Sequence, residues 1–145
     1  MADLNQQLKV VLASSFAMYL KAHNFHWNVE GPNFSEYHRL FGKIYEEIWE
    51  SVDQTAERIR ALDQYVPGSM SRFTQLSVVD DQLNIPNARS MVQELLSDNV
   101  KVIGELNKAF DLAEKANKQG IADYLAGRID AHEKHGWMLR ATLKQ

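Results

Sequence analysis

Four side chains in the first half of the chain could together bind a metal ion. His26 and His38 lie on either side of a Gly-Pro-Asn break at residues 31–33, and Asp53 and Glu57 follow, four residues apart. Residues four apart in a helix project from the same face. Two imidazoles and two carboxylates suit Fe(II) or another divalent metal of intermediate softness. The sequence therefore contains a candidate metal site made of two pairs.

The spacing between the two pairs restricts how such a site can form. His38 and Asp53 are fifteen residues apart on one predicted helix, which corresponds to about 22 Å along its axis. Ligands to one metal ion must each lie within about 2–2.5 Å of it. If the four residues form one site, the carboxylates must therefore come from a second copy of the chain. An isologous two-fold contact would then produce two equivalent sites.

The residues alone also allow a purely structural interpretation. A histidine in the apolar stripe of a helix is commonly a hydrogen-bonded core residue, and an Asp-x-x-x-Glu pair is commonly part of a solvated face. Arg58 and Arg60 could then neutralise the two carboxylates.

Motifs for several other chemistries are absent from the sequence. There is no Cys, which excludes disulfides and thiolate-held clusters. No Glu is followed by His three positions later, so we do not expect a di-iron centre inside one bundle. The zincin motif His-Glu-x-x-His is also absent, because His132-Glu-Lys-His135 has the wrong spacing.

Apolar residues at steps of three and four predict an all-α protein with four long helices. We expect these helices over residues 4–26, 34–65, 87–117 and 121–145. Asn33 or Ser35 could cap the second of them. The connection over 66–86 is long enough to cross the bundle, so that the second and third helices run parallel, and residues 73–79 could form a short helix in it. One long crossover is the ferritin-like arrangement.

The composition fits one soluble domain over residues 1–145, with 45% hydrophobic and 24% charged residues. A net charge of −3 argues against a nucleic-acid footprint over the whole surface. The first residues, MADLN, do not have the basic start and apolar run of a signal peptide, and no stretch approaches the roughly 18 apolar residues that a membrane span needs. We therefore expect a cytoplasmic protein that makes no membrane contact.

The segment HNFHWNVEGPNF at residues 23–34, with His38 and the later DQTAERI at 53–59, resembles the Dps family, the DNA-binding proteins from starved cells. The family signature includes His-Trp, a Gly-x-Asn-Phe turn, a His twelve residues after the first, and Asp-x-x-Ala-Glu-Arg. All of these occur here at matching spacing. The helix lengths, the crossover and the segment HGWML at 135–139 are also similar to the family.

The resemblance implies a homo-oligomeric cage, a dodecamer built on two-fold dimers, that oxidises Fe(II) and stores iron. Its members are ferroxidases that often prefer hydrogen peroxide to oxygen and protect against oxidative damage. The ferroxidase site would take His26 and His38 from one chain and Asp53 and Glu57 from its neighbour. Trp27 would be the site-adjacent residue that supplies or relays electrons.

The family also implies an acidic iron-entry pore near the start of the last helix. Asp123 is the first candidate for it and Glu114 the second, with an ordinary solvated acidic surface as the alternative for both. Gly42 departs from the family pattern, because many members have an acidic residue four positions after the second His. The missing carboxylate would weaken the second metal position, and Glu46 is a candidate substitute.

DNA binding is the other activity of the family, commonly through a mobile basic tail that neutralises phosphates. Neither terminus here is rich in Lys or Arg, so we do not expect binding through a tail, while contact through the cage surface stays open. The alternative to a ferroxidase is therefore a structural or DNA-coating shell with weak or no ferroxidase activity.

Overall fold

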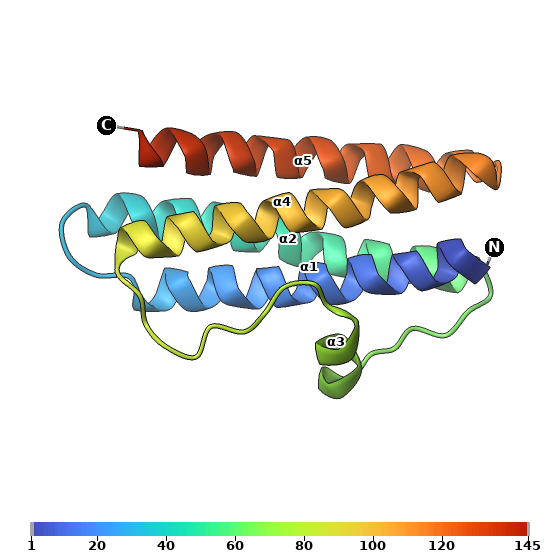
Figure 1. The fold of residues 1–145 in the computed structure, drawn as a ribbon, viewed down its shortest axis with the longest axis horizontal. Helices are drawn as coiled ribbons and strands as arrows, with labels where there is room; N and C mark the ends of the chain where they lie inside the picture. Colours follow the sequence, from blue (N-terminus) through green and yellow to red (C-terminus); the bar gives the residue numbers. More distant parts are fainter. Residues whose placement is uncertain (1, 145) are drawn as a thin grey trace.

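The computed structural model describes residues 2–144, and the side chains of residues 4–144. Four long helices lie along one another in an elongated bundle, and a short helix sits in the connection between the second and third of them (Figure 1). The helices are α1 (Ala2–Asn28), α2 (Phe34–Ala61), α3 (Met70–Leu76), α4 (Ala88–Lys115) and α5 (Gln119–Leu143). The connection from α2 to α4 returns along the length of the bundle, so α2 and α4 run in the same direction (Figure 1). The ferritin-like topology predicted from the sequence is confirmed.

The core lies between the long helices and is apolar. α1 packs closely against α2 and against α4, and α4 packs against α5. On α2, Phe41, Ile44, Ile48 and Ile59 are fully buried at the predicted helical spacing. α1 contributes Phe25 at the end of the core nearest the first chain break, where its ring lies 6.1 Å from that of Phe41. This contact places the last turn of α1 beside the first turns of α2.

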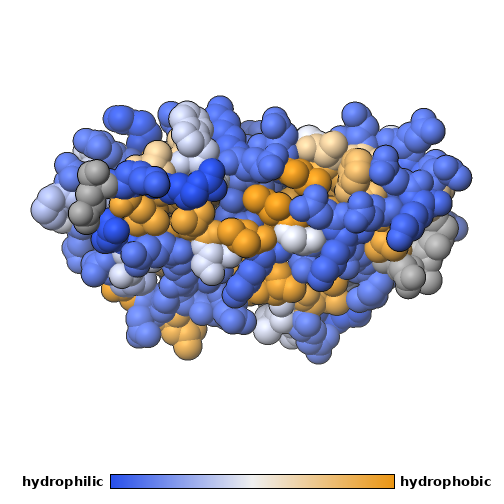
Figure 2. All heavy atoms as spheres, turned by 45° about the horizontal axis from the view of Figure 1, so that its top comes forward, coloured by the Kyte–Doolittle hydropathy of each residue, from blue (hydrophilic) through white to orange (hydrophobic). Residues whose placement is uncertain are grey.

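The face seen in Figure 2 is largely hydrophilic, with apolar side chains gathered in patches along it. Among the large apolar side chains that remain exposed are three tryptophans, Trp27, Trp49 and Trp137. Within residues 2–144, the length and hydropathy needed to cross a membrane do not occur together in any helix.

The predicted end of the second helix, near Tyr65, is wrong, because α2 ends at Ala61. Asp63 has a positive φ of 61° and its amide donates to the carbonyl of Arg60 at 2.9 Å. A left-handed residue at this point closes the last turn and directs the chain away from the helix axis. Asp is one of the residues that adopts this conformation most readily. The apolar pattern that continues to residue 65 therefore belongs to the connection.

Two further local predictions differ from the structure, one in the register of a helix and one in a capping side chain. The short helix is Met70–Leu76 and not 73–79, because the hydroxyl of Ser69 accepts from the amide of Arg72 and starts it earlier. Asn33 precedes α2, but its side chain makes no capping hydrogen bond. It is left-handed instead, with φ 65°, and its carbonyl accepts from the amides of Glu36 and Tyr37.

Candidate metal centre

The two predicted histidine ligands lie against one another where α1 ends and α2 begins. The rings of His26 and His38 are stacked, with centroids 3.7 Å apart and planes 18° apart. Nδ1 of His26 is 2.7 Å from the carbonyl oxygen of His38, and Nδ1 of His38 is 2.6 Å from the carbonyl oxygen of His26. A carbonyl oxygen only accepts, so each Nδ1 carries a proton and donates it. In the neutral rings the lone pairs available to a metal are therefore both on Nε2.

Gly42 makes room for this histidine pair. A Cβ at this position would lie 3.1 Å from both Cε1 and Nδ1 of the His26 ring. The ring is also stacked on that of His38, and its Nδ1 is hydrogen-bonded to the His38 carbonyl, so it has little freedom to move away. The residue that departs from the expected family pattern thus has a steric role: its missing side chain lets the His26 ring lie against α2.

The predicted carboxylate ligands are both exposed on α2. Asp53 lines a surface cavity of about 390 Å³ together with Trp49, Val52 and Phe73; we refer to it as the Asp53 cavity. Fifteen residues of helix separate Asp53 from His38, or about 22 Å along the axis. Within the described part of one chain, no group of three His, Cys, Asp or Glu is close enough to hold a metal ion. Within one chain, the two imidazoles therefore lie together, and the two carboxylates lie about 22 Å away from them along α2.

A row of aromatic rings between α1 and α2 connects the two regions. Tyr45 lies 5.2 Å from the His26 ring and stacks on His23, with centroids 3.7 Å apart and planes 7° apart. The hydroxyl of Tyr19 is 2.9 Å from Nδ1 of His23, and its ring lies 4.8 Å from that of Trp49. We refer to Tyr45, His23, Tyr19 and Trp49 as the aromatic row. No motif or spacing in the sequence indicated this row.

Trp27 contacts this row at the end nearest the histidine pair. Its ring centroid lies 3.9 Å from that of His23, and its side chain is 59% exposed. At the other end, Trp49 precedes Asp53 by one helical turn, and both line the Asp53 cavity. Oxidisable rings therefore extend from the imidazole pair to the carboxylate pair.

The chain is similar to known proteins in both sequence and fold. The chain matches the ferritin-like domain family over residues 2–145. It is 35% identical to the DNA protection during starvation protein of Brevibacillus brevis, over 96% of this chain and 97% of that protein. Its structure superimposes on the crystal structure of Dps from Staphylococcus aureus with a TM-score of 0.95 and 32% identity, covering 100% of this chain and 97% of that one. The chain belongs to the Dps family of ferritin-like proteins.

A second solved relative places the Dps family in a wider group. The chain superimposes on the Dps protein from Vibrio cholerae O1 with a TM-score of 0.93 and 28% identity, covering 97% of this chain and 89% of that one. That protein is described as a member of a broad superfamily of ferritin-like diiron-carboxylate proteins.

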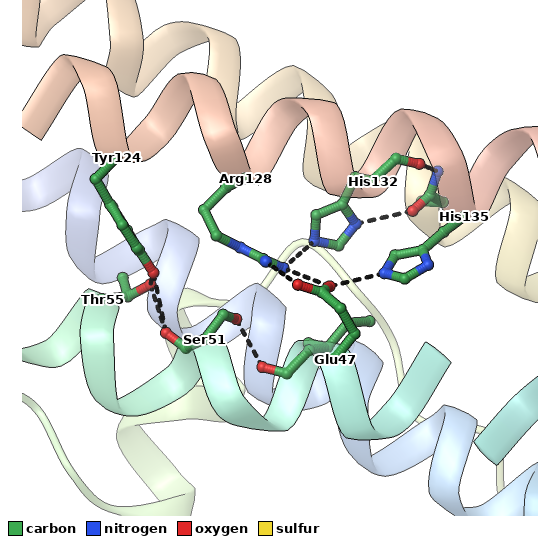
Figure 3. A network of polar contacts seen from close by, with 9 residues as sticks. Glu47, Ser51, Thr55, Tyr124, Arg128, His132 and His135 are labelled. Carbon is green, nitrogen blue, oxygen red and sulfur yellow. Dashed lines mark hydrogen bonds and ion pairs between the residues drawn. The ribbon is translucent and has the colours of Figure 1, made fainter. Parts of the chain in front are cut away.

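The inside of this Dps-family bundle contains a polar cluster that was not predicted from the sequence (Figure 3). Both terminal nitrogens of the Arg128 guanidinium, Nη1 and Nη2, donate to the carboxylate of Glu47, the second of them at 3.1 Å. His135 donates from Nε2 to the same carboxylate at 2.8 Å. Arg128 also donates to Nε2 of His132 at 3.1 Å, and Nδ1 of His132 donates to the amide oxygen of Asn99 at 2.8 Å. We refer to these five residues as the Arg128 cluster.

The Arg128 cluster contains residue types that bind metals, but a guanidinium is the cation at its centre. Arg128 occupies the carboxylate oxygens of Glu47 and the lone pair of His132 that a metal would need. The cluster therefore joins α2, α4 and α5 as a structural element. One pattern in the sequence could have revealed the cluster: Arg128, His132 and His135 follow one another at steps of four and three, which places them on one face of the last helix.

The two residues proposed for an iron-entry pore are exposed, Glu114 near the end of α4 and Asp123 in the first turns of α5. Asp123 lines a surface cavity of about 420 Å³ that also includes Glu47, Arg58 and Arg128. Two acids and two arginines balance in charge, so the cavity of a single chain is not an acidic funnel. The pore remains a prediction about the assembled protein.

The Arg128 cluster predicts that acid destabilises the fold. Burial alone would raise the pKa of Glu47 from its ordinary 4.5, but the hydrogen bonds from His135 and Arg128 outweigh it and hold the pKa at about 2. Burial, and then the charge of Arg128, lower the pKa of His132 well below 6.5. In both cases the unfolded chain binds the proton more readily, so stability must fall as the pH falls. The contribution of His132 is lost below about pH 6.5, and that of Glu47 is lost between about 4.5 and 2.

Urea unfolding midpoints measured in steps from pH 7 to pH 3 test this prediction. Glu47→Gln should be less stable than the wild type at pH 7, and the difference should shrink as the pH falls below about 4.5. Glu30→Gln, at an exposed position, serves as the control and should follow the wild type throughout. A constant difference between wild type and Glu47→Gln at every pH would contradict the prediction.

Proposed function

We propose that the chain is the subunit of a cage that oxidises Fe(II), with hydrogen peroxide as the oxidant, and stores the ferric product. The observation that carries this proposal is the stacked pair of His26 and His38, whose Nδ1 protons are both held by backbone carbonyls. A histidine bound in this way presents a fixed Nε2 lone pair, which is the usual arrangement of histidine ligands to metals. Membership of the Dps family supports iron as the metal.

The proposed site is completed by a second copy of the chain across a two-fold axis. His26 and His38 of one subunit would bind Fe(II), and Asp53 and Glu57 of the other would supply the hard oxygen ligands that favour Fe(III). The separation of about 22 Å within one chain supports this division. The exposed Trp49 and the Asp53 cavity supply an apolar surface on which a second subunit could pack. Two-fold dimers would then assemble into the dodecamer.

The proposed reaction consumes two Fe(II), one hydrogen peroxide and two protons, and yields two Fe(III) and two water molecules. Iron is the substrate of this reaction. The protein would bind iron at the sites shared between subunits. It would orient the two imidazoles of each site through their Nδ1 hydrogen bonds and keep the ferric product inside the cage.

Gly42 favours a second candidate function, a structural or DNA-coating shell that oxidises iron weakly. The chain has no acidic side chain at the position where many Dps proteins have one, so the site offers fewer oxygen ligands. The two candidates differ in the rate at which the assembled protein oxidises iron.

Anaerobic mixing of the protein with Fe(II), followed by hydrogen peroxide, distinguishes the two. We expect Fe(III) absorbance to appear faster than in buffer, at two Fe(II) per peroxide, and gel filtration to give about twelve times the mass of one chain. A rate equal to that of buffer would reject the ferroxidase. A clear shift of DNA mobility at about 150 mM salt would then favour the DNA-coating shell.

The contact between Gly42 and His26 gives a prediction about metal affinity. Gly42→Ala places a Cβ at 3.1 Å from the His26 ring, which must shift by a few tenths of an ångström. We expect the affinity for Co(II), used as a redox-stable substitute for Fe(II), to fall about tenfold, as when the support of a metal ligand is disturbed. Isothermal titration calorimetry measures this. Gly127→Ala, at a helical glycine with open space around it, is the control and should bind Co(II) as the wild type does.

A further inference from the structure

With Gly42 in place of the acidic residue that would support a second metal position, each proposed site holds one iron tightly, and one iron cannot by itself reduce hydrogen peroxide to water. That reduction takes two electrons, and one Fe(II) provides one. The second electron must come from another iron, and in a two-fold dimer the other proposed site is about 22 Å away. This problem arises only if the function proposed above is correct, and the inference rests on it.

We propose that the aromatic row conducts an electron between the two iron sites of a dimer, with Tyr45, Tyr19 and Trp49 as the relay residues. One chain gives its imidazoles to one site and its carboxylates to the other. A row of rings that runs from His26 to Trp49 therefore joins the two sites of the dimer through a single subunit.

The distances divide the long path into short steps. The ring of Tyr45 lies 5.2 Å from His26, that of Tyr19 lies 6.1 Å from Tyr45, and that of Trp49 lies 4.8 Å from Tyr19. The remaining step, from Trp49 to Asp53, is one helical turn, about 6 Å. The rate of electron transfer falls exponentially with distance. Transfer in short steps through three oxidisable rings is therefore much faster than transfer in one step over the whole path.

The chemistry of the row is suited to one-electron transfer. Tyrosine and tryptophan are the side chains that strong oxidants convert to radicals, whereas phenylalanine resists. A tyrosine loses its phenolic proton when it is oxidised, and the hydroxyl of Tyr19 lies 2.9 Å from Nδ1 of His23. A proton acceptor at this distance lets the phenol release its proton on oxidation and take it back on reduction.

The complete reaction balances over the two sites. At the first site, hydrogen peroxide takes one electron from its Fe(II) and one from the nearby end of the row, and with two protons it forms two water molecules. The electron lost by the row is replaced from the Fe(II) at the second site. Two Fe(III) remain, and Tyr45, Tyr19 and Trp49 return to their starting state.

Breaking the row should turn the same reaction into a source of hydroxyl radicals. Without the second electron, Fe(II) and hydrogen peroxide give Fe(III), hydroxide and a hydroxyl radical. Tyr19→Phe keeps the ring in place, but it removes the oxidisable phenol in the middle of the row. Tyr65→Phe makes the same change at a side chain that is 85% exposed and outside the row, and is the control.

Three measurements on the assembled protein test the relay. Spin trapping after the addition of peroxide should detect several times more hydroxyl radical for Tyr19→Phe than for wild type or Tyr65→Phe. The ratio of Fe(II) oxidised per peroxide should fall from two toward one in the same variant. Freeze-quenched wild-type samples should give a transient tyrosyl signal in electron paramagnetic resonance, and Tyr19→Phe should lose or change it.

Calorimetric titration with Co(II) separates the relay from the function on which it rests. If wild type and Tyr19→Phe bind Co(II) equally and also give equal radical yield, stoichiometry and spectra, the relay is rejected while the iron site stands. If wild-type protein binds no Co(II) and oxidises iron no faster than buffer, the proposed function itself is rejected.

Discussion

Protein made only of His38→Ala subunits, and protein made only of Asp53→Ala subunits, should each oxidise Fe(II) no faster than buffer. Cages assembled from an equal mixture of the two should have an intact ligand set at about a quarter of their sites and should again oxidise Fe(II) faster than buffer. The first result is expected because each variant lacks one half of every site. The second is expected because the two halves of a site come from different subunits.

The recovery follows from counting sites in the mixed dimers. Random pairing puts one subunit of each kind into about half of the dimers. In such a dimer, one site receives both substituted residues, and the other receives an intact His38 and an intact Asp53. About half of the dimers thus have one active site out of two, which is a quarter of all sites. A site contained in one chain would recover nothing.

A matched mixture serves as the control for this experiment. His26→Ala and His38→Ala both alter the imidazole side of the site, so each site in a mixed dimer lacks one histidine, and no recovery is expected. The two mixtures are prepared by unfolding and refolding together and are assayed with Fe(II) and hydrogen peroxide without oxygen. Equal recovery in both mixtures, or in neither, would contradict a site shared between subunits.

The fold could be predicted from the sequence because the features that determine it, helical periodicity and the length of one connection, can each be read from a continuous segment. Apolar residues at steps of three and four fixed the positions of the four long helices, and the length of the connection over 66–86 indicated the crossover. The errors arose where backbone conformation, not hydrophobicity, decided the outcome. The positive φ of Asp63 ended α2 early, and the hydroxyl of Ser69 started α3 early.

The candidate site could be predicted only in part. The types and spacing of His26, His38, Asp53 and Glu57 allowed a metal site divided between chains, and the resemblance to the Dps family favoured it over a structural interpretation. The ring contact of Gly42 and the aromatic row depend on how α1 and α2 lie beside one another, which periodicity does not specify. The Arg128 cluster was harder still, because Glu47 and His135 are 88 positions apart and meet only in the folded bundle.

Loss of the Arg128 side chain should have the largest effect on stability. Arg128→Met is expected to lower the free energy of unfolding by about 3 kcal/mol, because it removes one partner of a buried ion pair. Arg128 is 7% exposed and His132 is fully buried, so the Nε2 of His132 loses its donor with no access to water. Glu47 has a side-chain exposure of 36% and can regain some solvation, which keeps the effect below the upper end of the range for such pairs.

Urea unfolding at pH 7 and fixed protein concentration measures this difference, since assembly contributes to stability. Arg140→Ala, at an exposed position on the same helix, is the control and should change the free energy of unfolding by about 0.5 kcal/mol or less.

Arg128→Met combined with Glu47→Gln should recover part of the loss, because no unpaired carboxylate is then left beside the core. If Arg128→Met costs no more than Arg140→Ala, the cluster does not hold α2 to α5. If the double variant is as unstable as the sum of the single ones, the charge of Glu47 is not what makes the loss of Arg128 costly.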